Sequence, residues 1–167
     1  MTLSFTHHIV TQVENAAQLY HRLVLLVWPP RTGKTSAFRH LQAELGWPRI
    51  NINLALSERL LDLTVRQRAL RVARVLDEIV GACAADVTLL DNIELLFDPV
   101  LLQDPLRLLQ GLSRSRTVLA CWPGSFDGHA LVHATSAHPE HRRYEAPQAL
   151  IVSEHASFGF APPQFNP

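Results

Sequence analysis

Lysine is almost missing from this chain: Lys34 is the only one among 15 basic residues, and 15 acidic residues balance them. Because the formal net charge is zero, composition gives no general reason to expect binding to nucleic acid or to a membrane surface. The two cysteines, Cys83 and Cys121, show neither metal-ligand spacing nor a disulfide framework, which is typical of a reducing compartment.

No apolar run approaches the roughly 20 residues of a membrane span. Residues 1–8 lack the basic and apolar segments of a secretory signal. We therefore expect a cytoplasmic protein without a membrane segment.

The length, 167 residues, suits one domain with one hydrophobic core. We assign residues 1–155 to that domain, which opens with an amphipathic helix over about Thr6–His21. Residues 156–167 are expected to form a tail that contains Pro and Phe. Such a tail either docks on a neighbour or is disordered.

The single lysine lies in Trp28-Pro29-Pro30-Arg31-Thr32-Gly33-Lys34-Thr35, between an apolar run, Leu23–Val27, and a helical pattern, Thr35–Leu45. Strand, turn, Gly-Lys-Thr and helix form the Walker A context, in which backbone N–H groups cradle phosphates. Lys34 would reach the β/γ oxygens and the Thr35 hydroxyl would ligate Mg²⁺. The sequence therefore predicts ATP with Mg²⁺, bound by Pro30, Arg31, Thr32, Gly33, Lys34, Thr35 and Ser36. Trp28 replaces the first glycine of the motif, and the alternative is a Pro-rich turn that happens to precede Gly-Lys-Thr.

A second motif lies at the end of the apolar strand expected over Val87–Asp91. A carboxylate in that position is the Walker B arrangement, so Asp91 would hold Mg²⁺ through water, opposite Thr35. The alternative is an aspartate that caps the next helix. Many ring-type ATPases place a catalytic glutamate directly after this aspartate, whereas this chain has Asn92 there and Glu94 two residues later. Asparagine is a far poorer base, so the pattern supports nucleotide binding more directly than hydrolysis.

The other expected elements are strands at Arg49–Leu54, Arg116–Trp122 and Ala149–Val152, and helices at Thr64–Ala84 and from Asp104-Pro105 to Gly111. The longer helix carries four arginines opposite its apolar face: Arg66, Arg68, Arg71 and Arg74. They would either contact DNA phosphates or an acidic partner, or form a solvated face partly neutralised by Glu78. The polar segment before Pro147 contains His129 and His133, which on a helix would have metal-ligand spacing but are otherwise solvated histidines.

This order of motifs resembles an AAA-type P-loop core. The resemblance implies a three-layer α/β fold with a five-stranded parallel sheet in the order 5-1-4-3-2. More narrowly, the chain resembles the BrxF family, the small P-loop ATPase-like component of type 3 BREX (bacteriophage exclusion) systems. The segments that carry this resemblance are Tyr20–Leu26, Ile52–Leu60, Leu90–Pro99, Asp104–Gly111 and His138–Tyr144.

The BrxF resemblance implies a role in defence against phage, beside a methyltransferase, a large ATPase and other components. Arg142 and Arg143 precede the fifth strand, where AAA proteins often carry an arginine that reaches the neighbouring subunit's nucleotide; a surface arginine pair is the alternative. Only about fifteen residues follow that strand, so no helical lid is expected. Two functions stay open. One is a homo-oligomeric ATPase that acts on DNA. The other is a nucleotide-dependent docking module for other BREX components, with little or no turnover.

Overall fold

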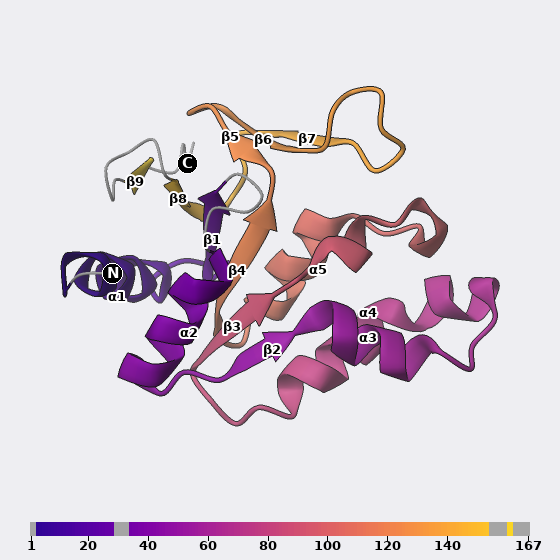
Figure 1. Ribbon diagram of the computed structural model, residues 1–167, viewed down its shortest axis with the longest axis horizontal. Coiled ribbons are helices and arrows are strands. Elements are labelled where there is room, and N and C mark those ends of the chain that lie inside the picture. Colours follow the sequence, from indigo (N-terminus) through magenta and orange to yellow (C-terminus); the bar gives the residue numbers. More distant parts are fainter. Residues whose placement is uncertain (1–2, 29–33, 154–159, 162–167) are drawn as a thin grey trace.

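The main sheet has six strands in the computed structural model, which describes residues 3–28, 34–153 and 160–161. Their order is β2-β3-β4-β1-β8-β9 (Figure 1). The strands are β1 (Leu23–Trp28), β2 (Arg49–Asn51), β3 (Val87–Asp91), β4 (Thr117–Pro123), β8 (Leu150–Ser153) and β9 (Phe160–Ala161). The first five of these pair in parallel, and β9 pairs antiparallel with β8. Read from β8, the parallel strands follow the expected order 5-1-4-3-2.

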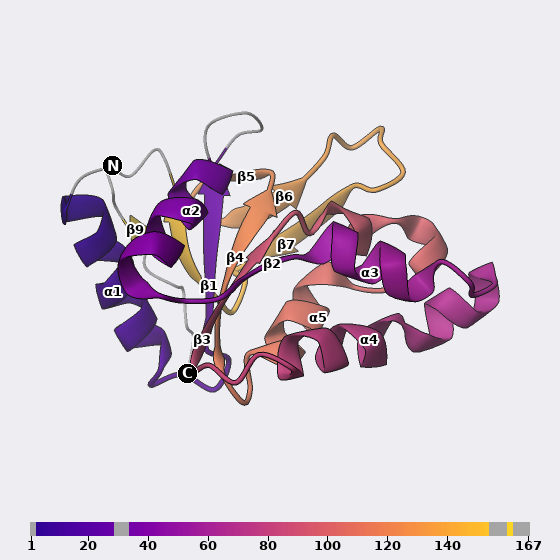
Figure 2. The same cartoon turned by 60° about the horizontal axis from the view of Figure 1, so that its bottom comes forward.

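Helices cover both faces of the sheet, which gives three layers (Figures 1 and 2). Alternate residues of β1 are buried on opposite faces. Val24 and Leu26 pack with α1 (Leu3–Ala16) and α2 (Lys34–Leu45). Leu23, Leu25 and Val27 belong to the cluster that includes α3 (Ile52–Leu60), α4 (Val65–Gly81) and α5 (Pro105–Leu112). This two-sided burial explains why β1 is apolar throughout.

Several expected boundaries are wrong. The first helix spans Leu3–Ala16 rather than about Thr6–His21, and α4 ends at Gly81 rather than Ala84. The expected strand over Arg49–Leu54 stops at Asn51, because the Asn51 side chain accepts a hydrogen bond from the Leu54 backbone N–H and so caps α3. The alternation of Ile50, Ile52 and Leu54 favoured a strand, but Ile52 already belongs to the helix.

The ends of two other helices follow the sequence closely. Thr64 and Gln67 form a reciprocal capping box at the start of α4. Asp104 accepts a hydrogen bond from the Arg107 backbone N–H, and Pro105 is the first residue of α5. Two short 3-10 helices, η1 (Glu94–Phe97) and η2 (Pro99–Leu101), connect β3 to α5.

The histidine-containing polar segment folds into a second, antiparallel sheet that the sequence did not predict. Its strands, in the order β5-β6-β7, are β5 (Ser125–Phe126), β6 (Ala130–His133) and β7 (Arg142–Glu145). This small sheet lies beyond the end of β4 (Figure 1). The Trp122 indole N–H donates to the Val132 carbonyl at 3.1 Å, and the Tyr144 hydroxyl donates to Asp104 at 2.9 Å. Both bonds fasten the small sheet to the main domain.

Among the described residues, no helix combines the length and apolar character that a bilayer crossing requires.

Candidate functional site

The Gly33-Lys34-Thr35 segment, which the sequence predicts to bind phosphate, lies between β1 and α2, as expected. Pro30, Arg31, Thr32 and Gly33 lie outside the described residues. Lys34 and Thr35 open α2, although their side chains are not described, and Ser36 is exposed in the first turn of that helix. The strand–segment–helix order is therefore confirmed.

Asp91 ends β3 with 2% of its surface exposed. Because side chains alternate along a strand, Asp91 lies on the same face as Leu89, which packs in the cluster of α1 and α2. β4 lies between β3 and β1, and all three strands are parallel. The carboxylate therefore sits at the carboxyl edge of the sheet, on the face covered by the helix that begins with Lys34.

Both oxygens of the Asp91 carboxylate already have partners. Oδ1 accepts a hydrogen bond from the Asn92 backbone N–H at 3.0 Å, and Oδ2 accepts from Nη1 of Arg49 at 3.1 Å. Arg49 opens β2 and also donates from Nε to Oε1 of Gln42 on α2, at 3.4 Å. Arg49 was not expected at this site. Its only sequence signal is a basic residue at the start of a segment in which apolar residues alternate with asparagine.

Asn92 has a positive φ of 49°, in the left-handed region that asparagine tolerates better than most residues. Its carbonyl accepts a hydrogen bond from the Asn53 backbone N–H at 2.8 Å. This turn directs the chain from β3 into η1, so the residue after Asp91 is constrained by its backbone. That requirement gives a structural reason for asparagine at this position.

Glu94 is held by α3. The Asn53 side chain donates to Glu94 Oε2 at 3.0 Å and accepts from the Leu95 backbone N–H at 2.8 Å. The Glu94 carboxylate is otherwise exposed, and α3 packs on the face of the sheet opposite to α2. Thus Asp91, Asn92 and Glu94 share one segment, but the two carboxylates contact different elements.

Arg142 and Arg143 both lie in β7 of the small sheet. Arg142 is half-buried and donates to the carbonyls of His141 and Gln103, at 3.2 and 3.4 Å. Arg143 is exposed and pairs with Glu145 at 2.7 Å. These contacts join Arg142 to the loop before α5, and they leave Arg143 on the surface.

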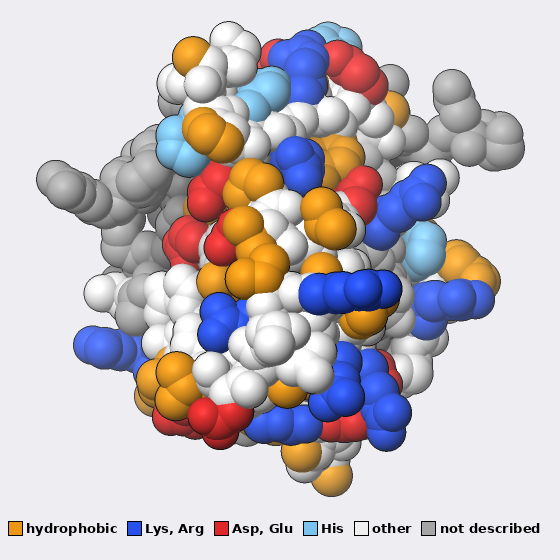
Figure 3. Space-filling view, turned by 90° about the vertical axis from the view of Figure 1, so that its right-hand side faces the viewer, with side chains coloured by type: hydrophobic (Ala, Val, Ile, Leu, Met, Phe, Trp, Pro, Cys, Tyr) orange, Lys and Arg blue, Asp and Glu red, His pale blue; other side chains and the backbone are white. Residues whose placement is uncertain are grey.

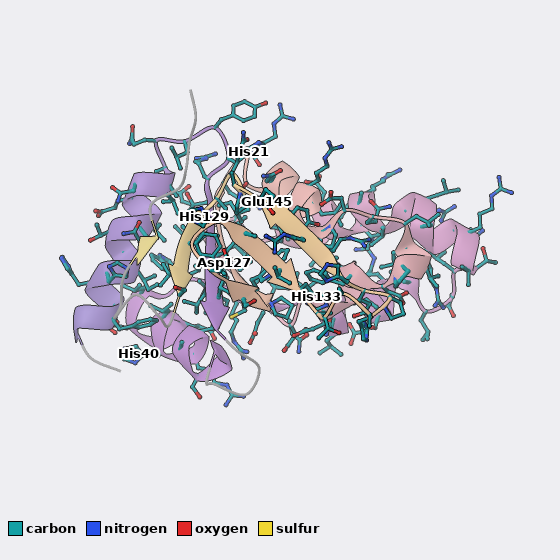
Figure 4. All side chains as sticks on the ribbon, turned by 90° about the horizontal axis from the view of Figure 1, so that it is seen from above. His21, His40, Asp127, His129, His133 and Glu145 are labelled. Carbon is teal, nitrogen blue, oxygen red and sulfur yellow. The ribbon has the colours of Figure 1, made fainter. Side chains whose placement is uncertain are left out.

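The histidines of the small sheet do not gather into a metal site. His133 is the last residue of β6 and His129 directly precedes its first residue, so the two share no helix face and the helical spacing considered for them is wrong (Figure 4). Hydrogen bonds from the backbone N–H groups of Ala130 and His129 lower the pKa of Asp127. No group of three or more His, Cys, Asp or Glu side chains in the described part of the chain is arranged to hold a metal.

The arginines of α4 have unequal roles. Arg68 is structural, because its guanidinium donates to the carbonyls of Leu60, Leu61 and Leu63 near the end of α3. Arg74 and Arg59 both pair with Glu78 and lower its pKa through hydrogen bonds. Arg66 and Arg71 are exposed. The end of the molecule that carries the α3–α4 turn presents arginine side chains among apolar ones (Figure 3). Self-neutralisation by Glu78 agrees with a solvated helix face.

No protein-family model, curated protein or solved structure matches this chain.

Proposed function

We propose that this chain is a nucleotide-binding P-loop ATPase component of a bacterial BREX defence system, with an AAA-like core. The observation that carries the proposal is the position of Asp91, a buried carboxylate at the carboxyl edge of a parallel sheet, on the face covered by α2. The Gly33-Lys34-Thr35 sequence lies where β1 passes into α2. A phosphate loop and a Walker B carboxylate need this combination.

The donor set fits a hydrated Mg²⁺ ion. A carboxylate has about four lone-pair positions, and Asp91 uses two of them for Asn92 and Arg49. Hard oxygen ligands, such as this carboxylate and the Thr35 hydroxyl, are those that Mg²⁺ prefers. When bound, the metal would neutralise charge on the β- and γ-phosphates. Asp91 and Thr35 would hold it, and Lys34 would contact the phosphate oxygens.

Calorimetric titration with ATP and ADP in the presence of Mg²⁺ tests this proposal. Wild type should bind, and Lys34→Ala should bind more weakly because contacts to the β/γ oxygens are lost. Arg66→Ala, an exposed residue on α4, serves as the matched control and should bind like wild type. Absence of binding by wild type, or equal binding by wild type and Lys34→Ala, would refute the proposal.

The second candidate is a nucleotide-dependent docking module with little or no turnover. Two residues favour it. Asn92 has a left-handed backbone conformation that asparagine tolerates, and the Glu94 carboxylate accepts a hydrogen bond from the Asn53 side chain on α3. Neither side chain provides a strong base beside Asp91. Steady-state phosphate release, with and without DNA, separates the two functions. Turnover that Glu94→Gln abolishes while binding survives would favour the ATPase.

The proposed working form is a homo-oligomer or a complex with other BREX components. In AAA proteins an arginine supplied by a neighbouring subunit stabilises the transition state, and Arg142 and Arg143 are the candidates here. Arg143 is the more available of the two, since it is exposed on β7. Light scattering with and without ATP, on wild type and on Arg143→Ala, measures assembly. A monomer under all conditions, with no defence protein bound, would refute this part.

A further inference from the structure

The buried carboxylate of Asp91 is already neutralised by a cation of the chain itself. Arg49 Nη1 lies 3.1 Å from Asp91 Oδ2, and the side chains of Arg49 and Asp91 are 25% and 3% exposed. A charge pair with so little solvent is weakly screened, so each charge strongly affects the other. A divalent cation that binds the Asp91 carboxylate would therefore be repelled by the positive charge of the Arg49 guanidinium beside it.

Strand register brings the two residues together. β2 and β3 are parallel, with Arg49 beside Leu89 and Asn51 beside Asp91. The backbone of Arg49 therefore lies beside the residue two positions before Asp91, and its side chain extends along the sheet to the Asp91 carboxylate. Gln42, on the exposed surface of α2, accepts from Arg49 Nε at 3.4 Å. The guanidinium thus has one partner on α2 and another at the end of β3.

We infer that Arg49 competes with the divalent metal for Asp91, and that the Arg49–Asp91 ion pair sets the metal affinity of the nucleotide site. This inference rests on the proposed function, because it assigns a role to Arg49 in the same site. Metal and guanidinium both require the negative charge of one carboxylate, and Oδ1 is already held by the Asn92 N–H. Gln42 offers the guanidinium a partner that does not depend on Asp91, so Arg49 retains one contact when the metal takes the carboxylate.

The experiment measures Mn²⁺ binding by electron paramagnetic resonance, with and without saturating ADP, together with melting temperatures. Arg49→Gln removes the charge and should bind Mn²⁺ about tenfold more tightly than wild type in the presence of ADP, since hydrogen bonds to charged groups contribute free energy of that order. Arg49→Lys keeps the charge and should stay close to wild type. Arg66→Gln, the matched arginine control on α4, should leave Mn²⁺ affinity unchanged.

Two further measurements keep the inference testable if Arg49→Gln folds poorly. Gln42→Ala removes only the exposed partner of Arg49 and should change Mn²⁺ affinity by less than Arg49→Gln does, because the ion pair to Asp91 survives. Without nucleotide, Mn²⁺ should raise the melting temperature of Arg49→Gln more than that of wild type, because the metal replaces the missing cation beside Asp91.

The outcomes separate this inference from the proposed function. If all variants bind ADP but Arg49→Gln binds Mn²⁺ no more tightly than wild type, competition by Arg49 is refuted while nucleotide binding stands. Equal tightening by Arg49→Lys and Arg49→Gln would also refute it, because charge would then not be the cause. If no variant binds ADP, the proposed function fails. In that case, selective stabilisation of Arg49→Gln by Mn²⁺ alone would still support competition for Asp91, and equal melting temperatures with and without Mn²⁺ would refute the competition as well.

Discussion

Replacing Gly124 by alanine should destabilise the protein by disrupting the packing of the small sheet, β5–β7, against the end of β4. Gly124 lies between β4 and β5, and an added Cβ would overlap the Val132 carbonyl group, 2.9 Å from its carbon, while approaching Trp122 Nε1 to 3.0 Å. Neither neighbour can move easily. Trp122 is fully buried, and Val132 is paired with strands on both sides, at Ser125 and Arg143. The glycine is required here for space rather than for an unusual φ.

The expected cost combines two effects. Overpacking of a well-packed site costs about 1–3 kcal/mol, and loss of the partly buried Trp122–Val132 hydrogen bond adds about 1–3 kcal/mol. We expect a decrease of about 3 kcal/mol in the free energy of unfolding, which corresponds to a decrease of about 6–12 °C in melting temperature for a domain of this size.

Urea unfolding followed by circular dichroism measures this change. Gly111→Ala is the matched control, because an added Cβ at Gly111, within α5, meets nothing within 4 Å. That substitution should stabilise the protein by up to about 1 kcal/mol, since glycine is unfavourable in a helix. The two glycine-to-alanine changes thus have opposite expected signs. A Gly124→Ala protein within about 0.5 kcal/mol of wild type would show that the β4–β6 junction adapts, and the packing argument would be wrong.

Three further predictions concern single side chains. Burial, and secondly the hydrogen bond to Asp104, raise the pKa of Tyr144, so the stability that its neutral hydroxyl contributes is complete below pH about 10 and declines as pH rises further. Tyr144→Phe should lower the free energy of unfolding at pH 8 by about 1–2 kcal/mol and make the alkaline decline in stability shallower. Urea titrations at several pH values measure this, and parallel pH profiles of the two proteins would contradict it. Thr64→Ala should cost about 1 kcal/mol by removing the capping box of α4, with reduced helical signal on thermal melting, and an unchanged melting temperature would disprove it. Asn92→Gly should keep wild-type stability, whereas Asn92→Glu should lower the free energy of unfolding by about 1 kcal/mol, because the backbone at position 92 has a positive φ. Equal stability of the two variants would exclude backbone strain as the reason for asparagine at this position.

Several elements were predictable because their local signals agree with their tertiary environment. The apolar run Leu23–Val27 became a strand buried on both faces, and Thr64 and Asp104 begin helices as their side-chain chemistry favours. The strand order also follows the expected 5-1-4-3-2 pattern. Asn51 shows where the local signal is ambiguous: Ile50 and Ile52 alternate as in a strand, yet Ile52, Leu56 and Leu60 are the buried residues of α3. A short apolar segment satisfies both periods, and the cap decides between them.

The small antiparallel sheet had no strong sequence signal, because its strands are only two to four residues long and β7 consists mostly of charged side chains. Two hydrogen bonds between residues distant in sequence hold it: Trp122 on β4 donates to Val132 on β6, and Tyr144 on β7 donates to Asp104 at the start of α5. His129 and His133, whose spacing had suggested a helix face, instead lie just before β6 and at its last residue.

By itself, the sequence determined the order of the five parallel strands, the Gly33-Lys34-Thr35 connection between β1 and α2, and the carboxylate that ends β3. Only the tertiary structure decided what surrounds Asp91. Arg49 lies 42 positions earlier in the chain and contacts the carboxylate because β2 and β3 pair in one particular parallel register. Register follows from the packing of whole strands and helices, so neither residue's local sequence specifies the contact. The charge balance of the candidate site is therefore a property of the fold.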